Sequence, residues 1–285
     1  MIYISTGGFK HQSASDSVKL LAKNGFLAIE LSGGLFEKNQ LKKLKNLQEK
    51  YGINFKVHNY FPPPFKPFVF NLASLNKDIA ALSIKHAMNA IDYSSELGSG
   101  VYSFHAGFLL DPGVSELGKT IPSRSLYDRT EAMNVFIKRV NDLSIYASSK
   151  KISLLIENNV VSNSNYKKFS GNPLLMTSKS ECIYVMKNTP DNVNLLVDVA
   201  HLKVSSKSLG LDGTSFLAQC KKWIKAYHLS DNNGLEDENK SFDSNSWFWN
   251  HITNGLDYYS LEVYTPSLNV LHDQSDLAES KVLKS

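Results

Sequence analysis

Residues 194–201 read Asn-Leu-Leu-Val-Asp-Val-Ala-His, so an apolar run stops at Asp198 and His201 follows three residues later. A short apolar run of this kind is typical of a buried β-strand. Runs of the same character stop at a histidine or a carboxylate at five other places, namely His58, His105, Glu157, His228 and Glu262. Because parallel strands meet at their carboxyl ends, we expect these seven side chains to converge at one end of a sheet.

Eight segments have the composition of strands, and helical periodicity lies between them. The clearest helical face falls within residues 133–147, where apolar residues recur at offsets of three, four and seven. The predicted strands are residues 2–5, 27–31, 54–58, 101–105, 152–157, 194–198, 224–229 and 258–263. Strands that are apolar on both faces and alternate with helices call for parallel pairing with right-handed crossovers. The sequence therefore predicts an α/β fold in which strand and helix repeat eight times and close into a (β/α)8 TIM barrel, with an open doubly wound sheet as the alternative.

Length and composition fit one domain. The chain has 285 residues, of which 42% are hydrophobic and 20% charged, and a parallel α/β barrel takes about 250 residues. No segment rich in Pro, Gly and Ser divides the sequence. We expect a single domain over residues 1–285, with the polar segment 265–285 as a C-terminal extension that forms a helix on the outside of the barrel and then frays.

Bulk charge and targeting signals narrow the class of protein. The net charge of +4 comes from lysines spread through helical segments, a pattern typical of solvated helix faces that leaves the charge of the substrate open. Cys182 and Cys220 are far apart and indicate neither a disulfide framework nor a zinc ribbon. The N-terminus lacks the pattern of a signal peptide, and no apolar run approaches the ~20 residues of a membrane span. We predict a cytoplasmic protein with no membrane partner.

The seven strand-end residues favour a metal site. Burying so many ionisable groups at one barrel mouth without a cation is costly, because desolvation and like-charge repulsion oppose it. Mixed oxygen and nitrogen donors without a thiolate suit Mn²⁺, Mg²⁺, Co²⁺ or Zn²⁺. The sequence thus predicts a divalent metal cofactor, with no choice among these four ions.

Other titratable residues fit the pattern less well. Asp231 follows His228 by three residues, and it could bind metal, orient His228 or cap a turn. The remaining histidines fall in helices or loops away from strand ends, and we assign them structural roles: His11, His86, His251 and His272.

Several short motifs resemble the xylose isomerase-like barrel superfamily, which holds sugar isomerases and epimerases together with the endonuclease IV type of DNA repair enzyme. The motifs are Val57-His-Asn59, Phe104-His-Ala-Gly107, Leu155-Ile-Glu-Asn158, Asp198-Val-Ala-His201, His228-Leu-Ser-Asp231 and Leu261-Glu262. The resemblance covers nearly the whole chain. It implies that Glu157, Asp198, His228 and Glu262 are the metal ligands and that His201 binds substrate or a further metal.

The endonuclease IV branch is similar in further segments, Asn71-Leu-Ala-Ser74 and Leu97-Gly98. That resemblance implies a cluster of three zinc ions that uses His58 and His105. Enzymes of this branch also need an Asp-x-His pair after the seventh strand, where this chain has Asp237-Glu-Asn239. Asparagine in place of histidine removes a good zinc ligand. Asp237 therefore is a candidate for binding substrate or an additional metal, but without the histidine that accompanies it in that branch.

The leading hypothesis is a metal-dependent sugar or sugar-phosphate isomerase/epimerase that works by proton transfer through an enediolate. The ligand set and the resemblance make Glu157 and Glu262 the acid/base pair. Trp247 and Trp249 are candidate walls of the substrate pocket, with core packing as the alternative.

A metal-dependent endonuclease at abasic sites is the second hypothesis, and a barrel that binds without turnover is the third. The expected partner is a small sugar or sugar phosphate. Nucleic acid is disfavoured because the sequence lacks a basic, aromatic surface motif. The sequence leaves the oligomeric state open, with a homo-oligomer as one alternative because the exposed helices of such barrels often pair.

Overall fold

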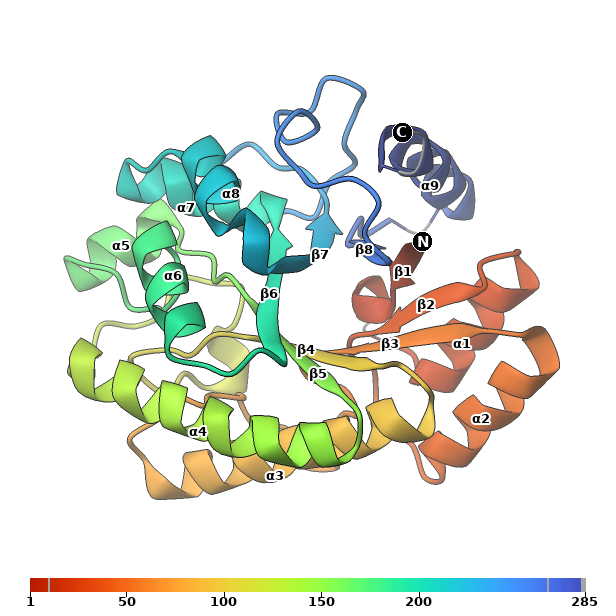
Figure 1. Ribbon diagram of the computed structural model, residues 1–285, viewed down its shortest axis with the longest axis horizontal. Coiled ribbons are helices and arrows are strands. Elements are labelled where there is room, and N and C mark those ends of the chain that lie inside the picture. The colour runs from red at the N-terminus through yellow and green to blue at the C-terminus, as the bar shows by residue number, and fades with distance from the viewer. Residues whose placement is uncertain (10, 266, 283–285) are drawn as a thin grey trace.

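Eight parallel strands pair in the order in which they occur in the chain, and the first also pairs with the last, which closes the sheet into a barrel. The computed structural model (Figure 1) describes residues 1–9, 11–265 and 267–282. The strands are β1 (Ile2–Ser5), β2 (Ala28–Leu31), β3 (Asn54–His58), β4 (Val101–His105), β5 (Ser153–Glu157), β6 (Val193–Asp198), β7 (Ile224–Leu229) and β8 (Tyr258–Leu261). All eight predicted strands are confirmed, and their bounds differ from the prediction by at most two residues. The TIM barrel is therefore confirmed and the open sheet is excluded.

Helices surround the barrel (Figure 1). They are α1 (Ala14–Lys23), α2 (Gln40–Tyr51), α3 (Lys77–Glu96), α4 (Arg129–Ser149), α5 (Asn163–Phe169), α6 (Lys179–Lys187), α7 (Val199–Leu209), α8 (Gly213–Cys220) and α9 (Leu268–Val282), with 3-10 turns η1 (Thr6–Gly8), η2 (Val114–Glu116) and η3 (Lys221–Trp223). The face predicted within residues 133–147 is the buried face of α4. No helix in the described part of the chain is long and apolar enough to cross a membrane.

The regular alternation of one helix after each strand is wrong in detail. Two helices follow β5 and two follow β6, whereas the described segment 230–257 between β7 and β8 contains none. Aromatic packing takes the place of a helix there, since Phe248 is fully buried. The side chain of Gln274 on α9 bonds to both the amide and the carbonyl of Phe242 and fixes the segment to the C-terminal helix.

The C-terminal helix packs against the outside of the barrel beside β1, as predicted. Its buried residues include Leu271, Ala278 and Val282. The fraying expected at the end of the chain concerns residues 283–285, which lie outside the described residues. Cys182 and Cys220 are buried and form no disulfide, in agreement with the sequence.

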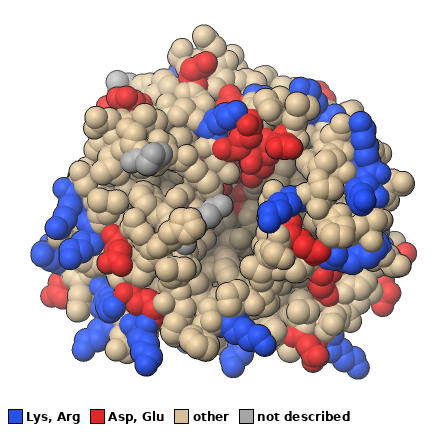
Figure 2. Space-filling model, turned by 180° about the vertical axis from the view of Figure 1, so that it is seen from behind, with Lys and Arg blue, Asp and Glu red and all other residues tan. Residues whose placement is uncertain are grey.

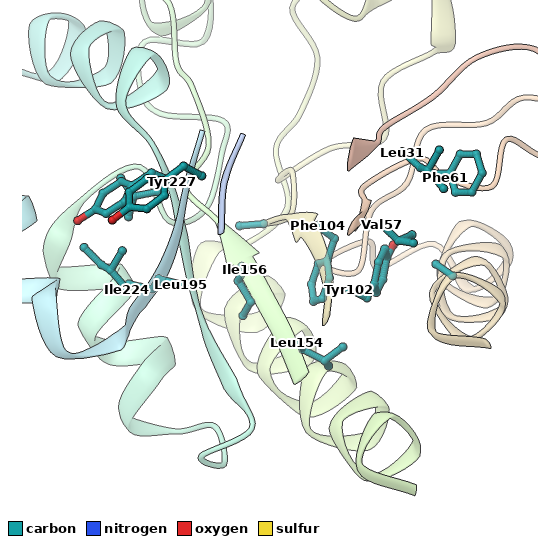
Figure 3. Close-up of a cluster of buried hydrophobic side chains, with 14 of the residues drawn as sticks. Leu31, Val57, Phe61, Tyr102, Phe104, Leu154, Ile156, Leu195, Ile224 and Tyr227 are labelled. Atoms are coloured by element: carbon teal, nitrogen blue, oxygen red, sulfur yellow. The ribbon is translucent and has the colours of Figure 1, made fainter. Parts of the chain in front are cut away.

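Successive residues of each strand face opposite sides of the sheet. On the outside, Tyr102 and Phe104 of β4 and Leu154 and Ile156 of β5 lie between strands and helices (Figure 3). On the inside, a smaller apolar cluster fills the barrel, made of Tyr3, Leu155, Leu196, Ala226 and Tyr258. The strands are therefore not apolar on both faces over their whole length. Their inward positions turn polar toward the carboxyl ends, and this is what places the site.

The loops after β3 and β4 are joined by one buried side chain. The side-chain Nδ2 of Asn71 donates to the backbone carbonyls of Phe108 and Leu110. Its Oδ1 accepts from the backbone N–H groups of Ala73 and Phe108. Gly107 makes this close approach feasible, because an added Cβ there would lie 2.2 Å from Cβ of Ala73 and 2.9 Å from Oδ1 of Asn71.

We expect Gly107→Ala to destabilise the fold by about 1–3 kcal/mol, because the new methyl group overpacks a site with no room. Urea unfolding followed by circular dichroism measures the change. Gly33→Ala is the matched control, since a Cβ at Gly33 meets nothing within 4 Å. Equal stabilities of the two variants would contradict the close-approach argument.

Candidate metal centre

The carboxylate of Glu157, at the end of β5, is surrounded by four histidines. Its Oε1 lies 3.1 Å from Nδ1 of His228 and 3.4 Å from Nδ1 of His201. Its Oε2 lies 3.3 Å from Nε2 of His58 and 3.1 Å from Nδ1 of His105. The four histidines come from β3, β4, α7 and β7, so the barrel brings together side chains that are far apart in the sequence.

The four residues implied as metal ligands meet around a single nitrogen. Nδ1 of His228 is 3.1 Å from Oε1 of Glu157, 3.8 Å from Oε2 of Glu262 and 4.0 Å from Oδ2 of Asp198. Three carboxylates and one imidazole thus meet near the carboxyl ends of four different strands, with Glu262 being the residue directly after β8. This is the donor set that Mn²⁺, Mg²⁺, Co²⁺ or Zn²⁺ accepts.

Three groups of donor atoms in the described residues have spacings within 4.8 Å that suit a metal ion. They are His58, His228 and Glu262; His58, His105 and Glu157; and Glu157, Asp198 and His201. Together they contain the seven residues predicted from the strand ends. Among the described residues, the buried Oδ2 of Asp198 has no hydrogen-bond donor, and the buried Oε2 of Glu157 faces the ring nitrogens of His58 and His105. Buried carboxylate oxygens are costly when unpaired, so the donor set fits a cation.

The Asp198-Val-Ala-His201 motif works through a helix cap. Asp198 is both the last residue of β6 and the N-cap of α7, where its Oδ1 accepts from the backbone N–H of His201 at 2.7 Å. The cap occupies Oδ1 and leaves Oδ2 without a hydrogen-bond partner among the described residues. Asn158 completes the corner, since its side chain accepts from the Asp198 N–H and donates to the Asp198 carbonyl.

The sequence analysis missed Glu30, which is fully buried on β2. Its Oε2 lies 2.8 Å from Nε2 of His228, and the hydroxyl of Tyr258 donates to the same oxygen. Glu30 sits one residue before the end of its strand, between Ile29 and Leu31. The signal that could have revealed it is the alternation itself, because a carboxylate between two apolar strand residues faces the opposite side of the sheet.

In the protein without metal, burial and neighbouring charges give the carboxyl groups of the cluster different pKa values. Burial, reinforced by Glu30, Glu157 and Asp198, raises the pKa of Glu262 to about 8. Burial also raises the pKa of Asp198 to about 6. For Glu157 burial acts in the same direction, but the histidines around it lower its pKa well below the usual range. One glutamate is therefore held ionised, whereas the other is held protonated at neutral pH.

Two further predicted residues lie at different places. Oδ2 of Asp237 is 3.2 Å from Nε2 of His201, at the edge of the cluster. Asp231 belongs to none of the three donor groups found in the described residues. Its carboxylate binds Lys203 at 2.6 Å and Ser246 at 2.9 Å and also accepts from the backbone of the next residue, so it holds a turn.

The two predicted wall tryptophans pack elsewhere. Trp247 contacts Phe248 and lies close to Gly213. Trp249 packs at a tilt against Phe248 and donates to the carbonyl of Asp243. A cavity lined by His105, His201 and Asp237 lies beside the cluster, and neither tryptophan is among its described lining residues. Both pack against the apolar core, which is the alternative that the sequence left open.

A cavity of about 610 Å³ opens from the cluster, with His105, His201 and Asp237 at one end. Its other walls include the aromatic side chains of Tyr60, Phe68, Phe70 and Phe108 and polar groups such as Asn159 and Asn165. Figure 2 shows a hollow on one face of the molecule with acidic side chains gathered beside it. A cavity with an apolar wall and a few convergent polar groups is typical of a small-molecule site.

The chain belongs to the xylose isomerase-like TIM barrel family, whose model matches residues 18–262. The uncharacterized protein MJ1311 of Methanocaldococcus jannaschii is 25% identical over 239 residues, which are 82% of this chain and 72% of that protein. The superfamily predicted from the strand-end motifs is therefore confirmed.

Solved structures with the same fold span the whole chain. A D-tagatose 3-epimerase-like protein has a TM-score of 0.74 at 18% identity, covering 99% of this chain and 97% of its own. The D-psicose 3-epimerase of Clostridium cellulolyticum H10, solved with D-tagatose, has a TM-score of 0.67 at 13% identity, covering 100% and 99%. At these identities the likeness establishes the fold.

Proposed function

We propose that the protein is a metal-dependent sugar isomerase or epimerase. The observation that carries this proposal is the approach of Glu157, Asp198 and Glu262 to Nδ1 of His228, all within 4.0 Å. Two structural neighbours support the choice of a sugar. One is a D-psicose 3-epimerase, and the other is described as a D-tagatose 3-epimerase-like protein. The proposed substrate class includes sugar phosphates.

Glu157, Asp198, His228 and Glu262 would hold the divalent cation. When bound, such an ion stabilises negative charge that develops on adjacent oxygens of the substrate. The aromatic wall formed by Tyr60, Phe68 and Phe70 offers apolar surface to the C–H face of a sugar, and polar side chains at the other end can bind its hydroxyl groups.

The two glutamates are suited to opposite halves of a proton transfer. When they hold the cation both glutamates would be carboxylates, and one would accept the proton α to a carbonyl while the other returns it. Removal and return of a proton through an enediolate gives epimerisation at the same carbon, or isomerisation when the proton returns to the neighbouring carbon. Ser5 donates to Oε1 of Glu262 at 3.3 Å and orients that carboxyl group.

Replacing Glu157 or Glu262 by Gln is expected to lower kcat at least about 100-fold while leaving the fold intact, because an amide cannot exchange the proton. Turnover of D-tagatose or D-psicose, followed by chromatography, measures the effect, and circular dichroism checks the fold. Glu96→Gln is the control, since Glu96 pairs with Lys45 on the outer surface. Full activity in both site variants would exclude the glutamate pair as the acid and base.

Removal of metal is expected to abolish turnover, and addition of Mn²⁺, Co²⁺, Mg²⁺ or Zn²⁺ should restore it, because the carboxylates then regain their counter-charge. Elemental analysis of the purified protein gives the number of ions per chain. One ion per chain supports the isomerase. Turnover that persists after complete removal of metal would contradict metal dependence.

A second function, cleavage of DNA at abasic sites, is favoured by one observation. His58, His105 and Glu157 form a separate donor group, which would provide a further metal position. Asn239 stands where the endonuclease branch needs the histidine of its Asp-x-His pair. The backbone carbonyl of Asn239 accepts from the N–H of Tyr264.

A gel assay on a duplex with one abasic site tests this alternative. We expect no cleavage, because Asn239 is a poor zinc ligand. Cleavage that disappears with a chelator, together with three zinc ions per chain, would instead establish the endonuclease.

A further inference from the structure

None of the roles proposed above uses Glu30, although it is fully buried beneath the donor cluster. A buried carboxylate is costly unless it is paired and hydrogen-bonded. Here Oε2 of Glu30 contacts Nε2 of His228 at 2.8 Å and accepts from the hydroxyl of Tyr258. These contacts satisfy Oε2 and hold the carboxylate against the back of the histidine ring, whereas Oε1 of Glu30 is buried without a hydrogen-bond partner among the described residues.

The contact determines which nitrogen of His228 is available. An ionised carboxylate only accepts hydrogen bonds, so Nε2 of His228 must carry a proton. A neutral imidazole protonated on Nε2 has its lone pair on Nδ1. Nδ1 lies 3.1 Å from Oε1 of Glu157 and 3.8 Å from Oε2 of Glu262. The ionised Glu157 places a proton on Nδ1 as well while the site holds no metal, and a bound cation would replace that proton.

We propose that Glu30, held by Tyr258, is a positioning residue that makes His228 bind a divalent cation through Nδ1. This inference rests on the proposed metal centre. Histidine ligands commonly donate their second N–H to a carboxylate, and loss of that partner typically lowers metal affinity 10- to 100-fold.

The same chain of contacts reaches the second buried histidine. Oγ of Ser103 is 3.4 Å from the hydroxyl of Tyr258 and 3.0 Å from Nδ1 of His58. Nε2 of His58 is thereby turned toward Oε2 of Glu157, at 3.3 Å. A belt of three side chains, Glu30, Tyr258 and Ser103, thus crosses the barrel. It contacts Nε2 of His228 and Nδ1 of His58. The other ring nitrogen of each histidine faces the carboxylates.

Titration of the metal-stripped full chain with Co²⁺, followed by visible absorption, tests the inference. In Glu30→Gln the amide can present either oxygen or nitrogen to His228, so protonation of Nε2 is no longer enforced. We expect the Co²⁺ affinity to fall about 10- to 100-fold and the absorption spectrum to change. Tyr258→Phe, which removes only the hydroxyl that holds Glu30, should lower the affinity measurably but by a smaller factor than Glu30→Gln.

Tyr259→Phe is the matched control, because Tyr259 is the next residue on β8 and its buried hydroxyl donates to the carbonyl of Thr253 on the outside of the barrel. We expect it to leave Co²⁺ binding unchanged. Wild-type affinity in both Glu30→Gln and Tyr258→Phe would overturn the inference, as would an equal loss in Tyr258→Phe and Tyr259→Phe. If Glu30→Gln does not fold, Tyr258→Phe decides. Wild-type protein that binds no Co²⁺ would overturn the metal centre itself, so the two failures are distinguishable.

Discussion

The carboxylate of Glu157 lies within 3.4 Å of a nitrogen of each of four histidines, and the arrangement of the barrel mouth depends on this contact. Two histidines face each oxygen, so a single side chain from β5 connects donors from opposite parts of the barrel. Such a buried cluster is stable only when charges and hydrogen bonds are balanced. Oδ2 of Asp198, which has no hydrogen-bond donor among the described residues, indicates where a cation would complete that balance.

The strands supply this precision because their inward residues form successive layers. Tyr258 belongs to the inner apolar cluster with Leu155 and Leu196, its hydroxyl reaches Glu30 and Ser103, and the candidate metal ligands lie at the carboxyl ends. Rigid strands hold side chains more accurately than loops do. The outer residues of the same strands pack beneath the helices, so the stability of the fold and the position of the site come from alternate residues of one element.

The two candidate reactions differ in the part of the cluster that they require. Proton transfer on a sugar needs Glu157 and Glu262 with one cation, whereas phosphodiester cleavage would need His58 and His105 as further ligands. Asn239 stands where a third zinc position would need histidine, and the cavity beside His105 and His201 has an aromatic wall. These features favour a small polar substrate with an apolar face.

The sequence by itself determined the strands, the barrel and the convergence of the seven titratable residues, because six of them end apolar runs, His201 follows Asp198 by three residues, and the direction of a parallel strand carries its last residue to one face. It did not reveal the absence of a helix between β7 and β8, where aromatic packing replaces one. It also did not reveal Glu30, which is separated by 198 residues from its partner His228 and by 228 from Tyr258. Only the closed barrel brings these side chains together, and so only the tertiary structure decided which nitrogen of each histidine faces the carboxylates. Local patterns specify where a strand ends, whereas hydrogen bonds across the barrel depend on the register of all eight strands.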